Sequence, residues 1–295
     1  MFDPAQLAAL AAVHRRGSFE LAAAELHVTA SAISQRLKAL EEAVGTLLIR
    51  RSQPCHATTA GLRMIRHHDE VTLLERTLAT DLPHLSPRAA TLRIAVNADS
   101  LATWVIPALA AVDGFLFDLV IDDQDTSQDW LKRGEVVAAI TSHPGPLQGC
   151  DTIPLGALRY RATASPTYMA RWMPNGATAQ ALAAAPALTF SDKDTLQQQW
   201  VARQSSSNLR RSAFPSHRLA SSTGFVDACL AGMGWGLNPS HLVADHLANG
   251  RLVELIENTP LDVALHWQFS RLTAPAIAPL TRAIRAAAAT VLIAP

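Results

Sequence analysis

Between residues 17 and 45 the apolar positions recur with the period of a helix, and they predict two short helices joined by a tight turn. Ser18 can cap the first helix, whose apolar residues recur at three- and four-residue spacing from Phe19 to Leu26. The connection that follows is too short to be a linker. The second helix carries one apolar stripe, which a globular domain would bury: Ile33, Leu37, Leu40 and Val44.

The opposite face of the second predicted helix is hydrogen-bonding and basic. Thr29 is the expected cap of this helix, and Gly45 is its expected end. Its outward residues follow the same spacing: Ser31, Ser34, Gln35 and Lys38. The DNA major groove admits such a helix, and its side chains can read base edges there. The pair is a candidate helix-turn-helix DNA reader, with an ordinary small helical domain as the alternative.

The segments on either side fit the same interpretation. Asp3 and Pro4 begin an earlier amphipathic helix. After the helix pair, a short apolar run and Pro54 predict a β-ribbon, or wing, with Arg50 and Arg51 at its tip. These cations would contact DNA phosphates, although paired arginines taken alone are equally compatible with a solvated turn.

A long helix is predicted to follow the wing, from Thr58 to about Leu82. Its apolar seam has helical spacing: Leu62, Ile65, Leu74, Leu78 and Leu82. The run His67–Glu70 contains metal-ligand residue types, but adjacent positions point to different sides of a helix, so we interpret it as a solvated face. Residues 83–90, with two prolines, are the expected hinge.

Beyond the hinge, short β-branched runs alternate with helical segments, which indicates α/β units with a largely parallel sheet. The expected strands are 92–96, 116–121 and 136–140. Each ends in polar side chains: Asn97-Ala98-Asp99-Ser100, Asp122-Asp123-Gln124-Asp125 and Thr141-Ser142-His143. Open α/β sheets bind ligands at the carboxyl ends of their strands, so these side chains are candidate ligand-binding groups.

A second α/β unit is predicted between two crossings of the chain. Residues 158–164 form the first crossing strand, and residues 261–269 form the return. The unit between them has polar strand ends at 191–194 and 221–223. Its glycine-rich stretch at 232–239 lacks the pattern of a phosphate-binding loop. Two such units joined by two crossings form a hinged clamp of the kind that periplasmic binding proteins use.

Charge is unevenly distributed along a chain that is formally neutral. The first 66 residues hold eight Lys and Arg against five Asp and Glu, so they carry +3 and the remainder carries −3. The basic end is therefore the candidate for nucleic-acid contact. The 295 residues, 49% of them hydrophobic, are sufficient for two or three units with real cores.

Cysteine usage and hydropathy bear on location. The three cysteines are far apart, which argues against a disulfide framework and fits a reducing cytoplasm: Cys55, Cys150 and Cys229. The N-terminus has the features of a helix start rather than of a signal peptide. The most apolar region, 101–121, is interrupted by proline, glycine and aspartate, so we expect no membrane span.

The order of residues in the helix pair adds a family resemblance. The string GSFELAAAELHVTASAISQRLKALEEAVG, followed by arginines and Thr58-Thr59-Ala60-Gly61, resembles the winged-helix N-terminus of LysR-type transcriptional regulators. The resemblance covers residues 1–66 motif by motif. It implies a winged helix-turn-helix, a dimerising linker helix and an α/β effector-binding half. It also implies a double-stranded DNA operator, a small-molecule effector and a homodimer or homotetramer, and it allows RNA polymerase as a further partner.

The helix pattern and the resemblance together assign a set of DNA-contacting residues: Ser18, Thr29, Ala30, Ser31, Ser34, Gln35, Arg36, Lys38, Arg50 and Arg51. Position 30 departs from the family pattern, since members commonly carry a base-reading glutamine there. Ala30 can contact a thymine methyl group but cannot donate or accept a hydrogen bond. The operator sequence at that contact is therefore left open.

Four further motifs resemble the ArgP/LysG branch of the family, which senses lysine and arginine and controls basic amino acid export: Asn97–Trp104, Gly134–Val137, Gly234–Pro239 and Leu261–Gln268. The expected effector-binding residues are Asn97, Asp99, Ser100, Asp122, Asp123, Asp125, Thr141, Ser142, Thr223, Trp235 and Asn238. Their carboxylates would pair with cationic groups, and their hydroxyls would hold a carboxylate. The alternative for Asp99 is that it only caps its helix.

A ligand-responsive DNA-binding regulator is the function that these observations favour. We expect no cofactor, no metal site and no enzyme, since the sequence lacks a G-x-S-x-G elbow, an H-E-x-x-H motif and a Gly-rich nucleotide fingerprint. Acids at 122–125 could hold magnesium, but an ammonium or guanidinium group is the simpler partner. A solute-binding protein would need an export signal and would not use the N-terminal reader. A LysR-type regulator with a different effector is the nearest alternative.

The expected domains follow from these elements. They are a winged helix-turn-helix DNA-binding domain over 1–58, a linker helix and hinge over 59–90, and an effector-binding domain over 91–295. The two crossings divide the last of these into subdomain I, about 91–160 and 266–295, and subdomain II, about 161–265.

Overall fold

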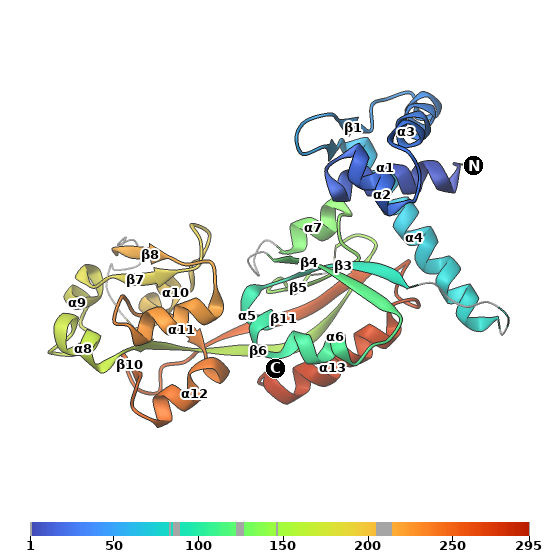
Figure 1. Cartoon of the computed structure of the whole chain (residues 1–295). Coiled ribbons are helices and arrows are strands. Elements are labelled where there is room, and N and C mark those ends of the chain that lie inside the picture. Colours follow the sequence, from blue (N-terminus) through green and yellow to red (C-terminus); the bar gives the residue numbers. More distant parts are fainter. Residues whose placement is uncertain are drawn as a thin grey trace.

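The computed structural model describes residues 2–82, 84, 89–121, 127–145, 147–204 and 214–294. The chain forms an N-terminal helical domain, a long helix and a larger α/β body (Figure 1). The helical domain stands over one end of the body, and the second α/β unit lies at the other end (Figure 1). The order of these parts is the predicted order.

Helices and a short ribbon build the N-terminal domain, here called the reader domain: α1 (Pro4–Arg16), α2 (Phe19–Glu25), α3 (Ala30–Val44), β1 (Ile49–Arg50) and β2 (His56–Ala57). Each helix begins at its predicted cap, because the side chains of Asp3, Ser18 and Thr29 accept hydrogen bonds from backbone N–H groups. The predicted stripe of α3 lies in the core of the domain, with these side chains fully buried: Ile33, Leu37 and Leu40.

The long helix α4 (Thr59–Asp81) connects the reader domain to the body, and Thr58 caps it as predicted. Its apolar seam is divided. Ile65 lies in the reader core, whereas Leu74 and Leu78 are 43% and 57% exposed on the single chain. Leu73, which is not in the predicted seam, is buried in the core of the body. The first part of the seam therefore packs within the chain, and the second part faces outward.

One seven-stranded sheet in the described part of the chain runs through the body in the order β10-β6-β11-β5-β3-β4, with β9 beside β6. Its strands are β3 (Ala90–Val96), β4 (Phe115–Ile121), β5 (Ala138–Thr141), β6 (Cys150–Ala164), β9 (Gly236–Pro239), β10 (Val253–Glu254) and β11 (Leu261–Ser270). Only β3, β4 and β5 pair in parallel. The prediction of a largely parallel sheet is wrong for the rest, because the long crossing strands β6 and β11 pair antiparallel with each other and with their neighbours.

The body divides into two units, for which the names subdomain I and subdomain II are kept. The helices of subdomain I are α5 (Ala98–Ser100), continued by a π-helical stretch (Leu101–Val105), α6 (Ile106–Ala110), α7 (Ser127–Arg133) and α13 (Ala278–Val291). Subdomain II holds α8 (Pro166–Trp172), α9 (Ala179–Ala184), α10 (Leu196–Gln204), α11 (Ser222–Leu230), α12 (Ser240–Ala248) and the pair β7 (Ala187–Thr189) and β8 (Ser216–Arg218). The crossing strands β6 and β11 join the two units at the middle of Figure 1. This arrangement is the predicted clamp.

Candidate DNA interface and effector site

The outer face of α3 lies on the surface of the reader domain. Its predicted reading residues are exposed or partly exposed: Ser31, Ser34, Gln35, Arg36 and Lys38. Lys38 lies 3.7 Å from Glu42 one turn further on, but both side chains are exposed, and such pairs contribute little. Lys38 is therefore available to a phosphate. One face of α3 offers donors, acceptors and cations while the opposite face is buried.

The predicted contacts at the helix starts have structural roles of their own. Ser18 Oγ accepts the N–H of Leu21 at 3.1 Å, and Thr29 Oγ1 accepts the N–H of Ala32 at 3.1 Å. Both hydroxyls are thereby fixed in position at the surface of the domain. Ala30 packs partly against the reader core, so this position contributes to packing as well as to the reading face.

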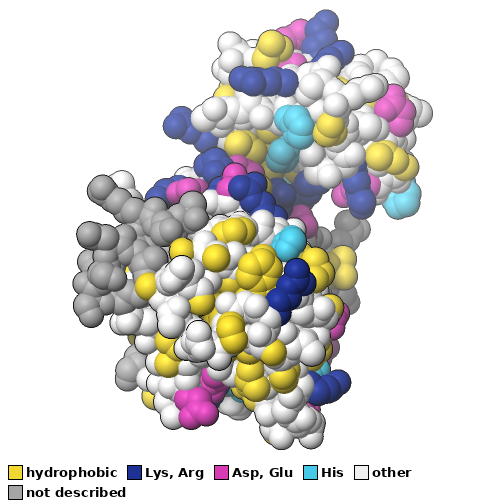
Figure 2. Space-filling view, turned by 90° about the vertical axis from the view of Figure 1, so that its left-hand side faces the viewer, with side chains coloured by type: hydrophobic (Ala, Val, Ile, Leu, Met, Phe, Trp, Pro, Cys, Tyr) yellow, Lys and Arg dark blue, Asp and Glu magenta, His cyan; other side chains and the backbone are white. Residues whose placement is uncertain are grey.

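The wing places two arginines at the edge of the reader domain. Arg50 lies opposite His56 in the ribbon, and the guanidinium of Arg51 lies over the ring of Phe19, 5.2 Å from its centroid. The sequence placed Phe19 only in an apolar run, yet it positions a wing cation through its ring face. Figure 2 shows Lys and Arg side chains gathered on the outer surface of the reader domain.

Replacing Arg50 and Arg51 together with alanine should lower DNA affinity without changing sequence preference. If each arginine neutralises one phosphate, the slope of log affinity against log salt should fall by about 2, because each neutralised phosphate releases about 0.9 counterion. Fluorescence anisotropy over a salt series measures this slope. Arg171→Ala, on α8 of subdomain II, is the matched control. An unchanged slope in the double variant would assign the two arginines to a solvated turn.

In the body, Asp99 lies where the two subdomains meet. Its Oδ2 accepts a hydrogen bond of 2.8 Å from the hydroxyl of Tyr160, on crossing strand β6. Ser222, at the start of α11, is close enough to favour the ionised form, although its hydroxyl falls short of hydrogen-bond geometry. Asp194 of subdomain II is also close enough to act on this carboxyl. Subdomain I, the crossing strand and subdomain II thus converge on one carboxyl group.

The surroundings of Asp99 make its ionisation less favourable than that of an aspartate in water. Burial raises the pKa of Asp99 above its ordinary value, and the charge of Asp194 raises it further. The hydroxyls of Ser222 and Tyr160 act in the opposite direction but do not cancel the effect of burial. No cationic side chain in the described part of the chain contributes to this balance. A positively charged group brought to this position would therefore be held by the ionised carboxylate.

Asn97, rather than Asp99, caps the short helix α5. Its Oδ1 accepts the N–H of Ser100 at 2.7 Å, so the alternative that Asp99 serves only as a cap is wrong. Asn97 Nδ2 and Ser100 Oγ are buried and have no hydrogen-bond partner within the described residues. Unpaired buried polar groups are unfavourable, so this end of β3 offers polar atoms that a ligand can satisfy.

The remaining predicted effector residues differ in how far they are exposed. Thr141 is fully buried at the end of β5, where its Oγ1 accepts the N–H of His143 at 3.2 Å. Ser142 is partly exposed, and Thr223 is exposed in the first turn of α11. Three predicted acids lie outside the described residues: Asp122, Asp123 and Asp125.

Two residues predicted to bind the effector, Trp235 and Asn238, lie in the core of subdomain II. Trp235 is fully buried, with ring centroids 5.6 Å from Trp200 and 5.7 Å from Phe214. Asn238 is also fully buried, on strand β9, and its Nδ2 donates to Thr163 Oγ1 at 3.0 Å. Trp235 Nε1 and Asn238 Oδ1 have no hydrogen-bond partner among the described residues, and effector contact by either residue stays a prediction.

The predicted set of effector-binding residues left out Tyr160 and Ser222. Tyr160 lies at an inward position of the alternating pattern over 158–164, where nothing separates its hydroxyl from the core. Ser222 neighbours the predicted Thr223, and only the helical phase of α11 decides which of the two is buried. Among the described residues, no three His, Cys, Asp or Glu side chains are arranged to hold a metal ion. No helix in these residues is long and apolar enough to cross a membrane.

Two family descriptions match the chain. Residues 4–62 match the bacterial regulatory helix-turn-helix protein, lysR family, and residues 86–289 match the LysR substrate binding domain. The second match alone covers more than half of the chain. The chain is therefore a DNA-binding transcriptional regulator of two-part construction, and it belongs to the LysR family.

Individual relatives are similar over nearly their whole length. The transcriptional regulator LysG of Mycobacterium bovis is 42% identical over 287 residues, covering 97% of this chain and 93% of that protein. ArgP of Pseudomonas aeruginosa is 41% identical over 293 residues, 98% of this chain and 96% of that protein. The crystal structure of ArgP from Mycobacterium tuberculosis matches with a TM-score of 0.81, 41% identity and full coverage of both chains. Full-length LysG from Corynebacterium glutamicum with bound effector Arg matches with a TM-score of 0.70, 34% identity and 99% coverage of each.

Proposed function

We propose that this chain is a cytoplasmic regulator that binds a double-stranded operator and changes its binding in response to L-arginine or L-lysine. The relatives support this effector class, because the similar LysG structure from Corynebacterium glutamicum contains bound Arg. The reader domain over 1–58 contacts the operator, and residues 91–295 bind the effector. The helix and hinge over 59–90 connect these two domains. The controlled genes serve basic amino acid export or metabolism, and RNA polymerase is a further partner.

Asp99 is the observation that carries the effector assignment. It is a partly buried carboxyl at the contact between subdomains, with hydroxyl neighbours and no cation beside it among the described residues. The α-ammonium or the side-chain cation of a basic amino acid would complete this arrangement as a charge-assisted hydrogen bond. Asn97 and Ser100 supply polar atoms that can hold the effector carboxylate. Tyr160 and Ser222 lie around the same carboxyl group, that of Asp99. An effector bound there would therefore contact both subdomains at once.

The outward part of the α4 seam supports a homodimer or homotetramer. Leu74, Leu78 and Leu82 are 43%, 57% and 43% exposed on the single chain. A row of exposed leucines with helical spacing is typical of a surface that a second helix covers. The dimer would bring two reader domains to two operator half-sites. An effector that closes the clamp changes the spacing of the two reader domains. The size of this shift depends on how much more tightly the effector binds the closed clamp than the open one.

A thermal-shift screen against the protein amino acids tests the effector class. At a concentration of about 100 times Kd, a ligand that binds only the folded state adds about 2.7 kcal/mol to the free energy of unfolding. For a domain of this size, that corresponds to a rise of roughly 5–10 °C in melting temperature. We expect this rise with arginine or lysine. Citrulline and norleucine are matched controls. Citrulline replaces the guanidinium of arginine with a neutral ureido group of the same size, and norleucine keeps the carbon chain of lysine without its ammonium group.

Other outcomes of the screen would change the assignment. A rise with an aromatic acid or a sugar alone would leave a LysR-type regulator with a different effector. Equal rises in melting temperature with arginine and citrulline would show that the side-chain cation is not recognised.

A further inference from the structure

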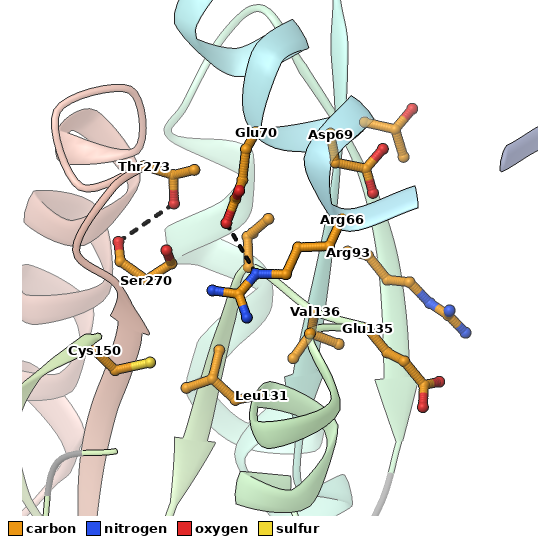
Figure 3. Close-up of a pocket in the computed structure, with 13 residues that line it drawn as sticks. Arg66, Asp69, Glu70, Arg93, Leu131, Glu135, Val136, Cys150, Ser270 and Thr273 are labelled. Atoms are coloured by element: carbon orange, nitrogen blue, oxygen red, sulfur yellow. Dashed lines mark hydrogen bonds and ion pairs between the residues drawn. The ribbon is translucent and has the colours of Figure 1, made fainter. Parts of the chain in front are cut away.

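Helix α4, which carries the reader domain, lies against its own effector domain at a narrow cleft lined by charged side chains, which Figure 3 shows in close-up. The cleft lies between α4, β3 and the turn that follows α7. A smaller neighbouring cleft extends to the end of α1. We call this region the junction and define it by six residues that line one or both clefts: Arg15, Arg66, Asp69, Arg93, Gly134 and Glu135.

Helix α4 belongs to both domains that meet at the junction. Ile65 is 6% exposed in the reader core, and Leu73 is 2% exposed in the core of the effector domain. These residues are about 12 Å apart along the helix axis at 1.5 Å per residue. A continuous helix anchored in both cores transmits a displacement at one end to the other. The junction residues of α4, Arg66 and Asp69, lie between Ile65 and Leu73 along the helix.

The reader side of the junction is held by ion pairs on α4. The Nη2 atom of Arg15, at the end of α1, lies 2.6 Å from each carboxylate oxygen of Asp69. One turn earlier on the helix, Arg66 Nε lies 2.9 Å from Glu70 Oε1. In Figure 3, Arg66 reaches from α4 into the cleft, and the side chain of Arg93, which also lines the cleft, extends in the opposite direction. The first pair fixes α1 to α4, and the second holds Arg66 in its extended position.

The effector side meets α4 at a glycine turn. Gly134 has a φ of 72°, and a Cβ atom there would lie 2.6 Å from Cδ of Arg66, so only glycine lets the arginine stem lie on this turn. A second arginine of α4 repeats the arrangement, since a Cβ atom at Gly114 would lie 2.4 Å from Arg76 Nη2. The position of Arg66 is therefore matched to the position of the Gly134 turn.

Two adjacent strands lead from the junction to the candidate effector site. Strand β3 carries Arg93 at the junction and reaches Asn97 just beyond its carboxyl end, about 13 Å away at 3.3 Å per residue. Strand β5 begins at Ala138, shortly after the Gly134 turn, and ends at the buried Thr141. The strands pair in parallel, and the N–H of Val137 donates to the carbonyl of Arg93 at 2.9 Å. Both strands thus have one end at the junction and the other at the effector site.

We propose that the junction is a latch through which the effector site sets the position of the reader domain. This inference rests on the proposed function. When the effector shifts the carboxyl ends of β3 and β5, the Gly134 turn moves against Arg66. Helix α4 and the reader domain then rotate about Leu73. The ion pairs Arg15–Asp69 and Arg66–Glu70 both lie on the reader side, and the effector side meets α4 through the Arg66 stem at the Gly134 turn. The contact suits reversible opening, because opening it breaks neither of these ion pairs.

The Arg66→Ala variant tests the latch, because it removes the side chain seated on Gly134 and leaves both binding surfaces in place. Arginine affinity, measured by calorimetry, should be unchanged. Affinity for an operator selected from random duplexes, measured without arginine, should also be unchanged. The change in operator affinity on adding arginine should shrink by about 2- to 30-fold. Lys132→Ala is the matched control, since Lys132 pairs with Asp129 on the exposed side of α7 and does not line the cleft.

Hydrogen exchange in the unaltered protein provides the second measurement. Adding arginine should change exchange at residues 131–137 and at the end of α1, and in Arg66→Ala the change at α1 should disappear. A full response to arginine in Arg66→Ala, with the same exchange changes as the unaltered protein, would overturn the latch and leave the proposed function standing. Absence of arginine binding in the unaltered protein would instead overturn the proposed function, and the latch with it.

Discussion

Replacing Asp99 with asparagine should remove most of the affinity for arginine or lysine. A hydrogen bond to a charged group contributes about 1.5–3 kcal/mol, which corresponds to roughly 10- to 150-fold weaker binding. Asparagine has the size of aspartate and can accept the hydrogen bond that Tyr160 now donates to Asp99 at 2.8 Å. It cannot supply the negative charge. Calorimetric titration of both proteins with arginine and lysine measures the difference.

The fold should tolerate this substitution. Burial raises the pKa of Asp99 in the folded state, so the ionised carboxylate disfavours the fold at pH values above that raised pKa. The neutral amide removes this cost, and the melting temperature should stay the same or rise. Operator binding without effector should also persist, because the substitution lies far from the reader domain in Figure 1. A fall in melting temperature would indicate a structural role instead.

The pH dependence of binding offers an internal check on the same residue. In the unaltered protein, a proton on Asp99 competes with the effector cation, so affinity should fall as the pH is lowered through the raised pKa. In Asp99→Asn this part of the dependence should be absent. Asp227→Asn, an exposed position on α11, is the matched control and should behave as the unaltered protein. Arginine affinity retained in Asp99→Asn would remove Asp99 from the site.

Loss of sequence-specific DNA binding is the second large expected effect, and it should follow from Ser34→Ala and Gln35→Ala. Both side chains lie on the outward face of α3, opposite the buried Ile33 and Leu37. A good base contact contributes about 1–3 kcal/mol of discrimination, so each variant should bind its operator about 5- to 150-fold more weakly. Non-specific binding should change little, because phosphate contacts by cations dominate it.

Gel-shift titrations against a selected operator and random duplexes measure both quantities. Gln180→Ala, an exposed position on α9, controls for the loss of a surface amide elsewhere in the chain. Circular dichroism should show both α3 variants folded, since neither side chain lies in the reader core. If both variants kept their full preference for the operator, α3 would not be the reading helix.

The reader domain could be predicted from sequence because its signals are local. The caps at Ser18 and Thr29, the buried stripe and the end of α3 at Gly45 each depend on residues within a few turns of one another. These short-range relations determine the helices before any tertiary contact is considered. Phe19 was the exception. Its contact with Arg51 joins residues on different elements, and helical periodicity holds no information about such a contact.

The candidate effector site could be predicted only in part, because it is assembled from distant segments. Asp99 was proposed from its position after a strand. Tyr160 and Ser222 approach it from the crossing strand and from subdomain II, and the linear pattern does not reveal that convergence. The burial of Trp235 and Asn238 was not predicted either, because a short motif does not show whether its residues line a site or pack in the core.

The junction could not be predicted for a related reason. Successive residues of a helix point about 100° apart, so the seam at Leu74 and the buried Leu73 face different partners. Leu73 packs within its own chain, and Leu74 is left for a second one in the proposed assembly. Helical spacing identifies an apolar face, but it does not identify what covers that face.

Operator footprinting with and without effector tests the central claim most directly. The intact protein is bound to an operator selected from random duplexes, and the protected bases are mapped with arginine, lysine or citrulline added. We expect arginine or lysine to change the extent of protection or the affinity, and citrulline to change neither. A footprint that arginine and lysine leave unaltered, or one that citrulline alters equally, would contradict a regulator that responds to basic amino acids.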